Sequence, residues 1–297
     1  MGRRLLVLAL VTGACNAELM DPRDTPVDAQ PTGDGSATDG PDGGGTMLGP
    51  WGTPTMIPGA NTAAGEDDAT MSPTGLEIIF AISDAADQGR KDLYVMTRTS
   101  TSGAFSTPTK LAFSVTGSSE ETPRLTTNGK TLYFASDRAG GAGGLDIYMA
   151  TRANPAAPWS APALVPGPNT TASEKWFMPC GSGNDYLLVA GPDLAMGTIN
   201  GAAPTVVAEL SSASPETGTF LTSDCLTSYF ASSRSGAFQI YTSHRTSTST
   251  AWQTPTVVTD FASVGGAQED PWISADGRTF LFVSNVSGSK DVYISTR

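Results

Sequence analysis

Acidic residues recur at five places in this sequence, each within or just ahead of a short segment that ends at a turn. A cluster of carboxylates creates a focused negative potential. Such a cluster could hold a cation such as Ca²⁺, which prefers clustered oxygen ligands, or could receive a basic peptide. The residues that could form the site are Glu66, Asp67, Asp68, Glu120, Glu121, Glu174, Glu216, Glu269 and Asp270.

The same acids have a structural interpretation, which we prefer. Recurring acids and arginines often form structural ion networks rather than sites. Each acid could cap a turn or pair with a recurring arginine. The arginines in question are Arg138, Arg152, Arg234 and Arg245.

Two tryptophans and two cysteines also interrupt the pattern of the acidic segments. Trp176 and Trp272 could stack on a sugar or a peptide, but packing between structural units is the simpler expectation for such large side chains. Cys180 and Cys225 are candidates for a disulfide in an exported protein. Such a bond requires a Cα separation below about 7 Å.

Other kinds of chemistry find no support. The single histidine, His244, belongs to no HExxH motif and no GxSxG or CxxC motif accompanies it, so we expect neither a zinc site nor a Ser–His–Asp triad. No phosphate-binding loop precedes a helix. The formal net charge of −12 excludes nucleic acid as a partner, because phosphate binding needs a basic surface.

The elements that must position these residues come from an internal repeat. Five copies are anchored on a turn residue, and these residues stand 42 to 54 positions apart: Gly75, Gly129, Gly183, Cys225 and Gly277. Each copy contains four short segments with strand composition, such as TLYFAS and LDIYMATR. The chain also contains 33 Gly and 21 Pro in 297 residues, a content that is typical of many turns. This period predicts an all-β fold, a five-bladed β-propeller of four-stranded blades.

The two ends of the repeat predict how the ring closes. The fifth copy stops at Arg297 after its third strand, and the segment beginning at Trp51 matches the fourth-strand segment beginning at Trp159. An N-terminal strand that completes the last blade would remove two exposed sheet edges. Repetition of these aromatic positions, with Trp252, marks them as structural.

The copies resemble the TolB-type, WD-like propeller repeat, whose pattern is roughly ExPxxSxDGxxLYFxSxRxGGxDIY. The resemblance covers residues 51–297, although the third copy lacks the SDR and DIY elements. It implies a propeller that binds partners or takes part in cell-envelope assemblies, with any catalytic domain carried separately.

The N-terminus predicts an address outside the cytoplasm. Residues 1–15 have two arginines, a short apolar run and Cys15, and resemble a bacterial lipoprotein signal peptide with Cys15 as the lipidation site. A plain secretory peptide is the alternative. Residues 16–50 are rich in Asp, Gly, Pro and Thr and are expected to be a disordered tether. By resemblance to enterobacterial lipoproteins, which carry Asp at this position for retention in the inner membrane, Asn16 implies anchoring to the outer membrane, by the lipid alone.

These observations predict a monomeric, non-enzymatic cell-envelope lipoprotein that uses its propeller to bind a protein or ligand, with no cofactor beyond a Ca²⁺ ion that the acids could hold. The alternative is a carbohydrate-binding or glycosidase-like propeller with an acidic channel mouth. Hydrolysis needs two carboxyl groups in different environments, and Asp185 and Asp193 are the least symmetric candidates. A purely structural envelope component is a third hypothesis.

Overall fold

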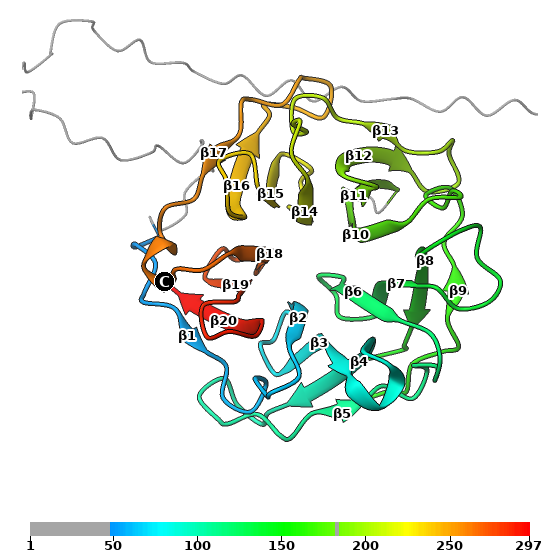
Figure 1. Ribbon diagram of the computed structural model, residues 1–297, viewed down its shortest axis with the longest axis vertical. Coiled ribbons are helices and arrows are strands. Elements are labelled where there is room, and N and C mark those ends of the chain that lie inside the picture. The colour runs from blue at the N-terminus through cyan, green and yellow to red at the C-terminus, as the bar shows by residue number, and fades with distance from the viewer. Residues whose placement is uncertain (1–47, 182–183) are drawn as a thin grey trace, which may run out of the picture. The chain divides into compact units, whose positions relative to one another are not determined.

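The computed structural model describes residues 48–181 and 184–297, which form five four-stranded antiparallel sheets arranged in a ring (Figure 1). The chain is therefore a five-bladed β-propeller, as the repeat predicted. The helical segments of the described residues are two short 3₁₀ turns, η1 (Ala85–Asp87) and η2 (Ala262–Val264). No helix in these ranges is long and apolar enough to cross a membrane. Cys15, the predicted signal peptide and nearly all of the predicted tether lie outside the described residues.

The first strand of each blade lies nearest the centre of the ring (Figure 1). These strands are β2 (Glu66–Met71), β6 (Glu120–Leu125), β10 (Glu174–Cys180), β14 (Glu216–Leu221) and β18 (Gln268–Ile273). The second strands are β3 (Glu77–Asp84), β7 (Thr131–Ser136), β11 (Asp185–Ala190), β15 (Thr227–Ser232) and β19 (Thr279–Ser284). The third strands are β4 (Arg90–Thr97), β8 (Asp146–Thr151), β12 (Asp193–Thr198), β16 (Gln239–His244) and β20 (Asp291–Thr296). The fourth strands are β5 (Thr109–Lys110), β9 (Ala163–Leu164), β13 (Thr205–Val206), β17 (Thr256–Val257) and β1 (Thr55–Met56).

The last blade contains both ends of the described chain. Strand β1 pairs with β20, with Thr55 opposite Ile294 and Met56 opposite Tyr293. The side chain of Asn61 strengthens this junction by bonding both the main-chain N–H and the C=O of Val292. The ring thus closes in the way that the match between the N-terminal segment and the second copy predicted.

The second strands carry the core, because both of their faces are covered by neighbouring blades. In β7 every residue from Leu132 to Ser136 is buried. Phe134 packs in a stacked arrangement against Phe113 and Tyr148, with ring centroids 5.2 and 6.1 Å apart. A strand covered on both faces needs a near-continuous apolar sequence, which is why segments such as TLYFAS do not alternate.

An arginine after the third strand ties four of the five blades to their own turns. Its Nε donates to the turn carbonyl and its guanidinium lies over the aromatic ring ahead of the fourth strand. The sets are Arg98, Gly75 and Phe105; Arg152, Gly129 and Trp159; Arg245, Cys225 and Trp252; Arg297, Gly277 and Trp51. We call this arrangement the arginine clasp. The expectation that Arg152 and Arg245 pair with the recurring acids was wrong, because their guanidinium groups serve the clasp; Arg152 also pairs with Glu77 of the first blade.

The third blade lacks a clasp and is joined to the fourth blade instead. Cys180 ends β10 and forms a disulfide with Cys225, with a Cα separation of 5.3 Å. The N–H of Gly181 donates to the carbonyl of Ser223 beside it. Cys225 occupies the turn position that glycine fills in other blades and has the left-handed φ of 65° that this turn requires.

Candidate functional site

Every first strand carries a β-bulge at the same place. The pairing of each first strand with its second strand shifts register between the second and fifth residues of the first strand. The third residue of each strand has a left-handed φ between 52° and 59°. These residues are Asp68, Thr122, Trp176, Gly218 and Asp270. A bulge re-aims a side chain, so these five positions form one level of the central channel.

The glutamates at the start of the first strands do not belong to that level. Each of the four is buried, with 0 to 2% of its surface exposed, and three of them bind the loop that enters their blade in the same way. The carboxylate of Glu174, for example, accepts from the N–H and hydroxyl of Thr170. Glu66 binds Thr62 and Glu216 binds Ser212 in the same manner, whereas Glu120 accepts from the N–H of Val115.

Two of these glutamates also form the arginine pairs that the sequence suggested. Arg138 lies 3.0 Å from Glu120, and Arg234 lies 3.1 Å from Glu216. In the fifth blade the equivalent residue is Gln268, whose amide donates to the carbonyl of Phe261. The structural interpretation therefore describes the contacts of the glutamates at this position.

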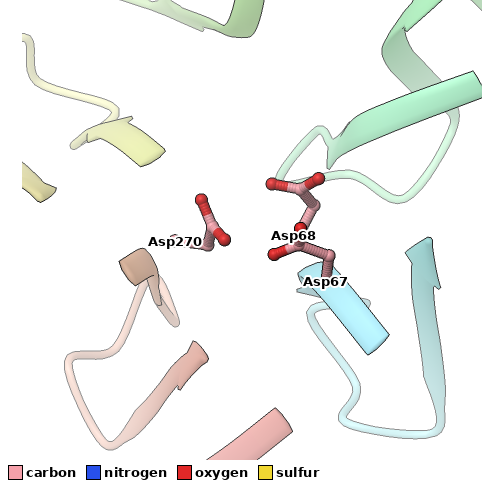
Figure 2. Close-up of side chains that lie close together, drawn as sticks. All are labelled: Asp67, Asp68 and Asp270. Carbon is pink, nitrogen blue, oxygen red and sulfur yellow. The ribbon is translucent and has the colours of Figure 1, made fainter. Parts of the chain in front are cut away.

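The aspartates of the first and fifth blades form a separate cluster. One carboxylate oxygen each of Asp67, Asp68 and Asp270 lies within 4.8 Å of the other two, and all three residues are buried. Figure 2 shows the side chains from β2 and β18 pointing toward one another. We call these three residues the aspartate cluster.

The cluster has an uneven distribution of charge. Burial, followed by the charges of Asp68 and Asp67, raises the pKa of Asp270 well above its ordinary value. Burial also raises the pKa of Asp67, but Lys91 and a hydrogen bond from Asp270 outweigh it, so the pKa of Asp67 lies below its ordinary value. Among the described residues, no donor reaches either oxygen of Asp270, so its raised pKa favours the protonated form over the carboxylate.

Asp68 is held by two neighbouring blades. Its Oδ1 accepts from the indole N–H of Trp176 at 2.5 Å, and its Oδ2 accepts from the N–H of Thr122 at 3.3 Å. Burial, and next the charge of Asp67, raise the pKa of Asp68. The hydroxyl of the same residue, Thr122, is buried and has no hydrogen-bond partner among the described residues.

Three lysines cover the acids at this end of the channel. Lys91 lies 2.7 Å from Asp67 and 3.5 Å from Glu121. Lys290 lies 3.2 Å from Asp67 and 3.1 Å from Glu269, and Lys175 lies 3.2 Å from Glu121. Acids and ammonium groups alternate here, so the carboxylates at this end of the channel are paired within an ion network.

Arg124 lies deeper in the channel. It is the fifth residue of β6 and only 1% of its surface is exposed. Its Nε and one terminal nitrogen donate across the channel to the carbonyl of Thr219 in the fourth blade, and the other terminal nitrogen donates to the carbonyl of Pro123. The side chain therefore crosses between blades on the far side of the bulge level.

Two adjoining hollows lie where the first strands run into their turns, at the end of the channel opposite the aspartate cluster. The larger, of about 190 Å³, is lined by Arg124, Leu125, Thr126, Thr127, Asn128, Met178, Pro179, Cys180, Gly181 and Ser223. The smaller, of about 30 Å³, shares four of these residues and adds Phe220 and Trp272 among others. We call the larger one the turn-side hollow.

The structure thus separates residues that the sequence grouped. The aspartate cluster brings together Asp67, Asp68 and Asp270, and Trp176 donates a hydrogen bond to Asp68. The ion network beside the cluster contains Glu121 and Glu269. Trp272 is buried against Phe220 and faces the smaller hollow instead of the acids.

The two less symmetric acids, and the lone histidine, lie apart from the cluster. Asp185 starts β11 and is exposed, whereas Asp193 starts β12 and pairs with the other end of β11, so they form no carboxylate pair. His244 is exposed at the end of β16 and contacts Thr227.

Sequence reasoning missed Lys91, Lys290, Thr122 and Arg124. A signal existed for Arg124: it stands in a first-strand segment that the repeat places along the channel, where a charged side chain must find partners.

Comparisons with known proteins show the fold alone. No protein-family model and no curated protein matches the chain. An endo-arabinase from Bacteroides thetaiotaomicron matches with a TM-score of 0.55 at 11% identity, over 82% of this chain and 96% of that one. The catalytic domain of an α-L-arabinofuranosidase from Coprinopsis cinerea matches with a TM-score of 0.53 at 11% identity, over 84% and 97%. TolB from Acinetobacter baumannii matches with a TM-score of 0.47 at 12% identity, over 79% of this chain and 55% of that one, so this chain spans about half its length.

Proposed function

We propose that this chain is a non-enzymatic lipoprotein of the bacterial cell envelope, and that its propeller binds a segment of a partner protein at the turn-side hollow. The observation that carries the proposal is where open space lies along the channel. The hollow receives side chains from the second, third and fourth blades, and Leu125 and Met178 give it apolar walls. Apolar pockets with a few convergent polar groups are the usual places for ligands.

The arrangement of the carboxylates favours binding over hydrolysis. A glycosidase needs an acid and a base or nucleophile that both reach the scissile bond. Asp68 and Asp270 are 0% and 1% exposed, and Lys91 and Lys290 pair with Asp67 at the same level. A sugar ring has no route to these groups without breaking the ion network. The two arabinan-processing neighbours share the fold and nothing further.

The test uses a photo-crosslinking residue at Thr127, an exposed position that lines the hollow. The full chain is expressed in its own cell and irradiated. We expect a covalent adduct with one envelope protein, and no adduct when the same group replaces Thr107, an exposed residue of the first blade's outer loop. Equal labelling from both positions, or release of arabinose from arabinan by the purified chain, would contradict the proposal.

The expected address is tested separately. The disulfide between Cys180 and Cys225 suits an oxidising compartment, which supports export. Replacing Cys15 by alanine should move the protein from the membrane fraction to the soluble fraction of the envelope, because the proposed membrane anchor is a lipid chain on Cys15. An unchanged membrane fraction would leave the proposed binding role in place and remove the proposed lipid anchor.

A cation site at the aspartate cluster is the second candidate. Both carboxylate oxygens of Asp270 and the hydroxyl of Thr122 are buried without donors, and Ca²⁺ coordinates six to eight oxygens. A bound Ca²⁺ would displace the proton of Asp270 and compete with Lys91 and Lys290. Calorimetric titration with Ca²⁺ should show uptake coupled to proton release, and Asp270→Asn should abolish both. The absence of heat and of any shift in melting temperature would remove this candidate.

A further inference from the structure

The charge of Arg124 has no direct counter-ion in the part of the chain that the structure describes. Its hydrogen bonds go to the main-chain carbonyls of Pro123 and Thr219. Burial lowers its pKa, and Asp68, Asp270 and Asp67 oppose that change from a longer distance. A buried charge is costly unless an opposite charge lies close to it, so the position favours an anion beside the guanidinium.

The nearest acids are already engaged elsewhere. Asp68 accepts from Trp176 and Thr122, and Asp67 pairs with Lys91 and Lys290. Burial and the charges of Asp68 and Asp67 raise the pKa of Asp270, which opposes the charged form that could neutralise the guanidinium. The guanidinium group has five N–H donors, and its three contacts with main-chain carbonyls leave donors for a ligand.

Arg124 is among the residues that line the turn-side hollow, although only 1% of its surface is exposed. Arg124 is the one charged side chain among the residues that line it; Thr126, Thr127 and Asn128 supply neutral polar groups, and Leu125 and Met178 supply apolar ones. At about 190 Å³ the hollow is smaller than the roughly 300–1,000 Å³ of pockets for drug-sized ligands. Its size suits one residue of a peptide, and it is too small for a sugar oligomer.

The hollow is also closed at its inner end. Arg124 crosses from the second blade to Thr219 of the fourth, and the aspartate cluster lies beyond the bulge level. A polypeptide can therefore enter the hollow from the turn side with its end, but cannot pass through. A chain end that enters with its C-terminus brings one carboxylate to the guanidinium.

Resting on the proposed function, we propose that the turn-side hollow recognises the C-terminal carboxylate of a partner protein whose last residue is apolar, with Arg124 as the carboxylate anchor. Charge-assisted contacts of a guanidinium with a carboxylate are strong and can be bidentate. The last side chain packs on Leu125 and Met178, and the neighbouring threonines and Asn128 contact the main chain of the segment.

The probes are N-acetyl-leucine and N-acetyl-leucinamide, which differ only in the carboxylate. Both are titrated into the full chain, purified in detergent, and binding is followed by calorimetry. We expect the acid to bind at least tenfold more tightly than the amide. Lys130→Gln is the matched control, because Lys130 is an exposed cation at the same turn but does not line the hollow, and it should keep the difference.

Two variants of Arg124 give the specific readout. Arg124→Gln should remove the preference for the acid, and Arg124→Lys should retain part of it because a charge remains without the fork of donors. Should either variant fail to fold, the comparison of acid with amide on the unchanged chain still decides the matter. Inorganic phosphate serves as a third probe, and binding as tight as that of the acid would show general anion capture and overturn the inference.

The outcomes separate the inference from the proposed function. Equal affinity for acid and amide, or binding of neither, overturns carboxylate recognition. The adduct from Thr127 is measured independently, and its presence in either case retains the hollow as the partner site. Loss of both the adduct and the acid preference overturns both proposals.

Discussion

At the scale of single residues, Asp67 and Asp270 show how two positions in one cluster give identical side chains different pKa values. Both are buried aspartates, yet the site raises the pKa of one and lowers that of the other. The difference follows from position, because Asp67 faces two lysines while Asp270 faces Asp67 and Asp68. Gly218 lies against Asp270, and a Cβ at this position would lie 2.6 Å from Asp270 Oδ1.

This difference predicts an unusual pH dependence. The raised pKa of Asp270 means that its contribution to the free energy of unfolding is fully present below the ordinary aspartate pKa of 3.8 and is lost as the pH rises through the raised value. Asp270→Asn should therefore flatten the fall in stability toward alkaline pH and raise the free energy of unfolding at neutral pH by about 1–2 kcal/mol. Urea unfolding of both chains from about pH 4 to about pH 9 measures the pH dependence of the free energy of unfolding.

Asp260→Asn provides the control for that measurement, because Asp260 is exposed in a loop. It should leave the pH profile unchanged. A profile of Asp270→Asn that parallels the unchanged chain would show that Asp270 is ionised throughout, and the proton assigned to the Asp67–Asp270 pair would then be withdrawn.

How much of the site the sequence could predict is also clearest at this scale. The recurrence of acids identified Asp67, Asp68 and Asp270 as candidates, and the disulfide partners were found from their positions in neighbouring copies. The division between the loop-binding glutamates and the aspartate cluster could not be predicted. It depends on a bulge whose left-handed residue is an aspartate, a threonine, a tryptophan or a glycine, so no single residue type marks it.

At the scale of elements, the repeated bulge is the feature that builds the channel. An extra residue in each first strand places five positions, one from each blade, at one height around the axis. The fourth blade uses glycine there, and a Cβ on Gly218 would lie 2.5 Å from the main-chain nitrogen of Asp270. Glycine at this position therefore makes room for the aspartate cluster.

Gly218→Ala should be much more destabilising than Gly191→Ala. Both glycines have a left-handed φ, 54° and 62°, but a Cβ on Gly191 meets nothing within 4 Å. Gly191→Ala should lower the free energy of unfolding only by the backbone strain, about 1–2 kcal/mol. Gly218→Ala adds a clash with main-chain atoms, which cannot rotate away. Thermal and urea unfolding of the two variants test this, and equal losses would mean that β14, the first strand of the fourth blade, can shift freely.

The third blade provides the element-scale prediction for the disulfide. It lacks an arginine clasp, and a crosslink across 45 positions contributes up to about 4 kcal/mol in the loop-entropy model. Replacing Cys180 by alanine and Cys225 by glycine should lose less stability than replacing both by alanine, because glycine relieves the left-handed turn position. Unfolding of the unchanged chain under reducing and non-reducing conditions measures the contribution of the disulfide. Comparison of the two double variants measures the strain at Cys225, and an identical loss of stability in both would exclude that strain.

At the scale of the whole molecule, the strand inventory was predictable and the arginine clasps were not predicted. Strand composition, turn residues and period identified all five blades, including the degenerate third. In three blades the clasp ring stands seven positions after its arginine, as with Arg98 and Phe105, so a local spacing existed in the sequence. The contact of Arg297 with Trp51 becomes visible only once the ring is closed.

Ring closure makes a testable demand on the N-terminal segment. Removing residues 48–58 should abolish cooperative unfolding of the propeller, since β20 loses its partner and Arg297 loses Trp51. Moving residues 51–58 to a position after Arg297, joined by a loop like that of residues 153–158 in the second blade, should restore it. Circular dichroism on heating compares the three chains. A truncated chain as stable as its parent would show that the ring does not depend on β1.

The pairing of β1 with β20 also has a consequence for the order of events during synthesis. Thr55 is made long before its partner Ile294. Among the described strands, β1 is thus the first to leave the ribosome, and it acquires its neighbour only after β20 has been made. Such distant pairings slow folding, and the last blade stays incomplete until β20 emerges.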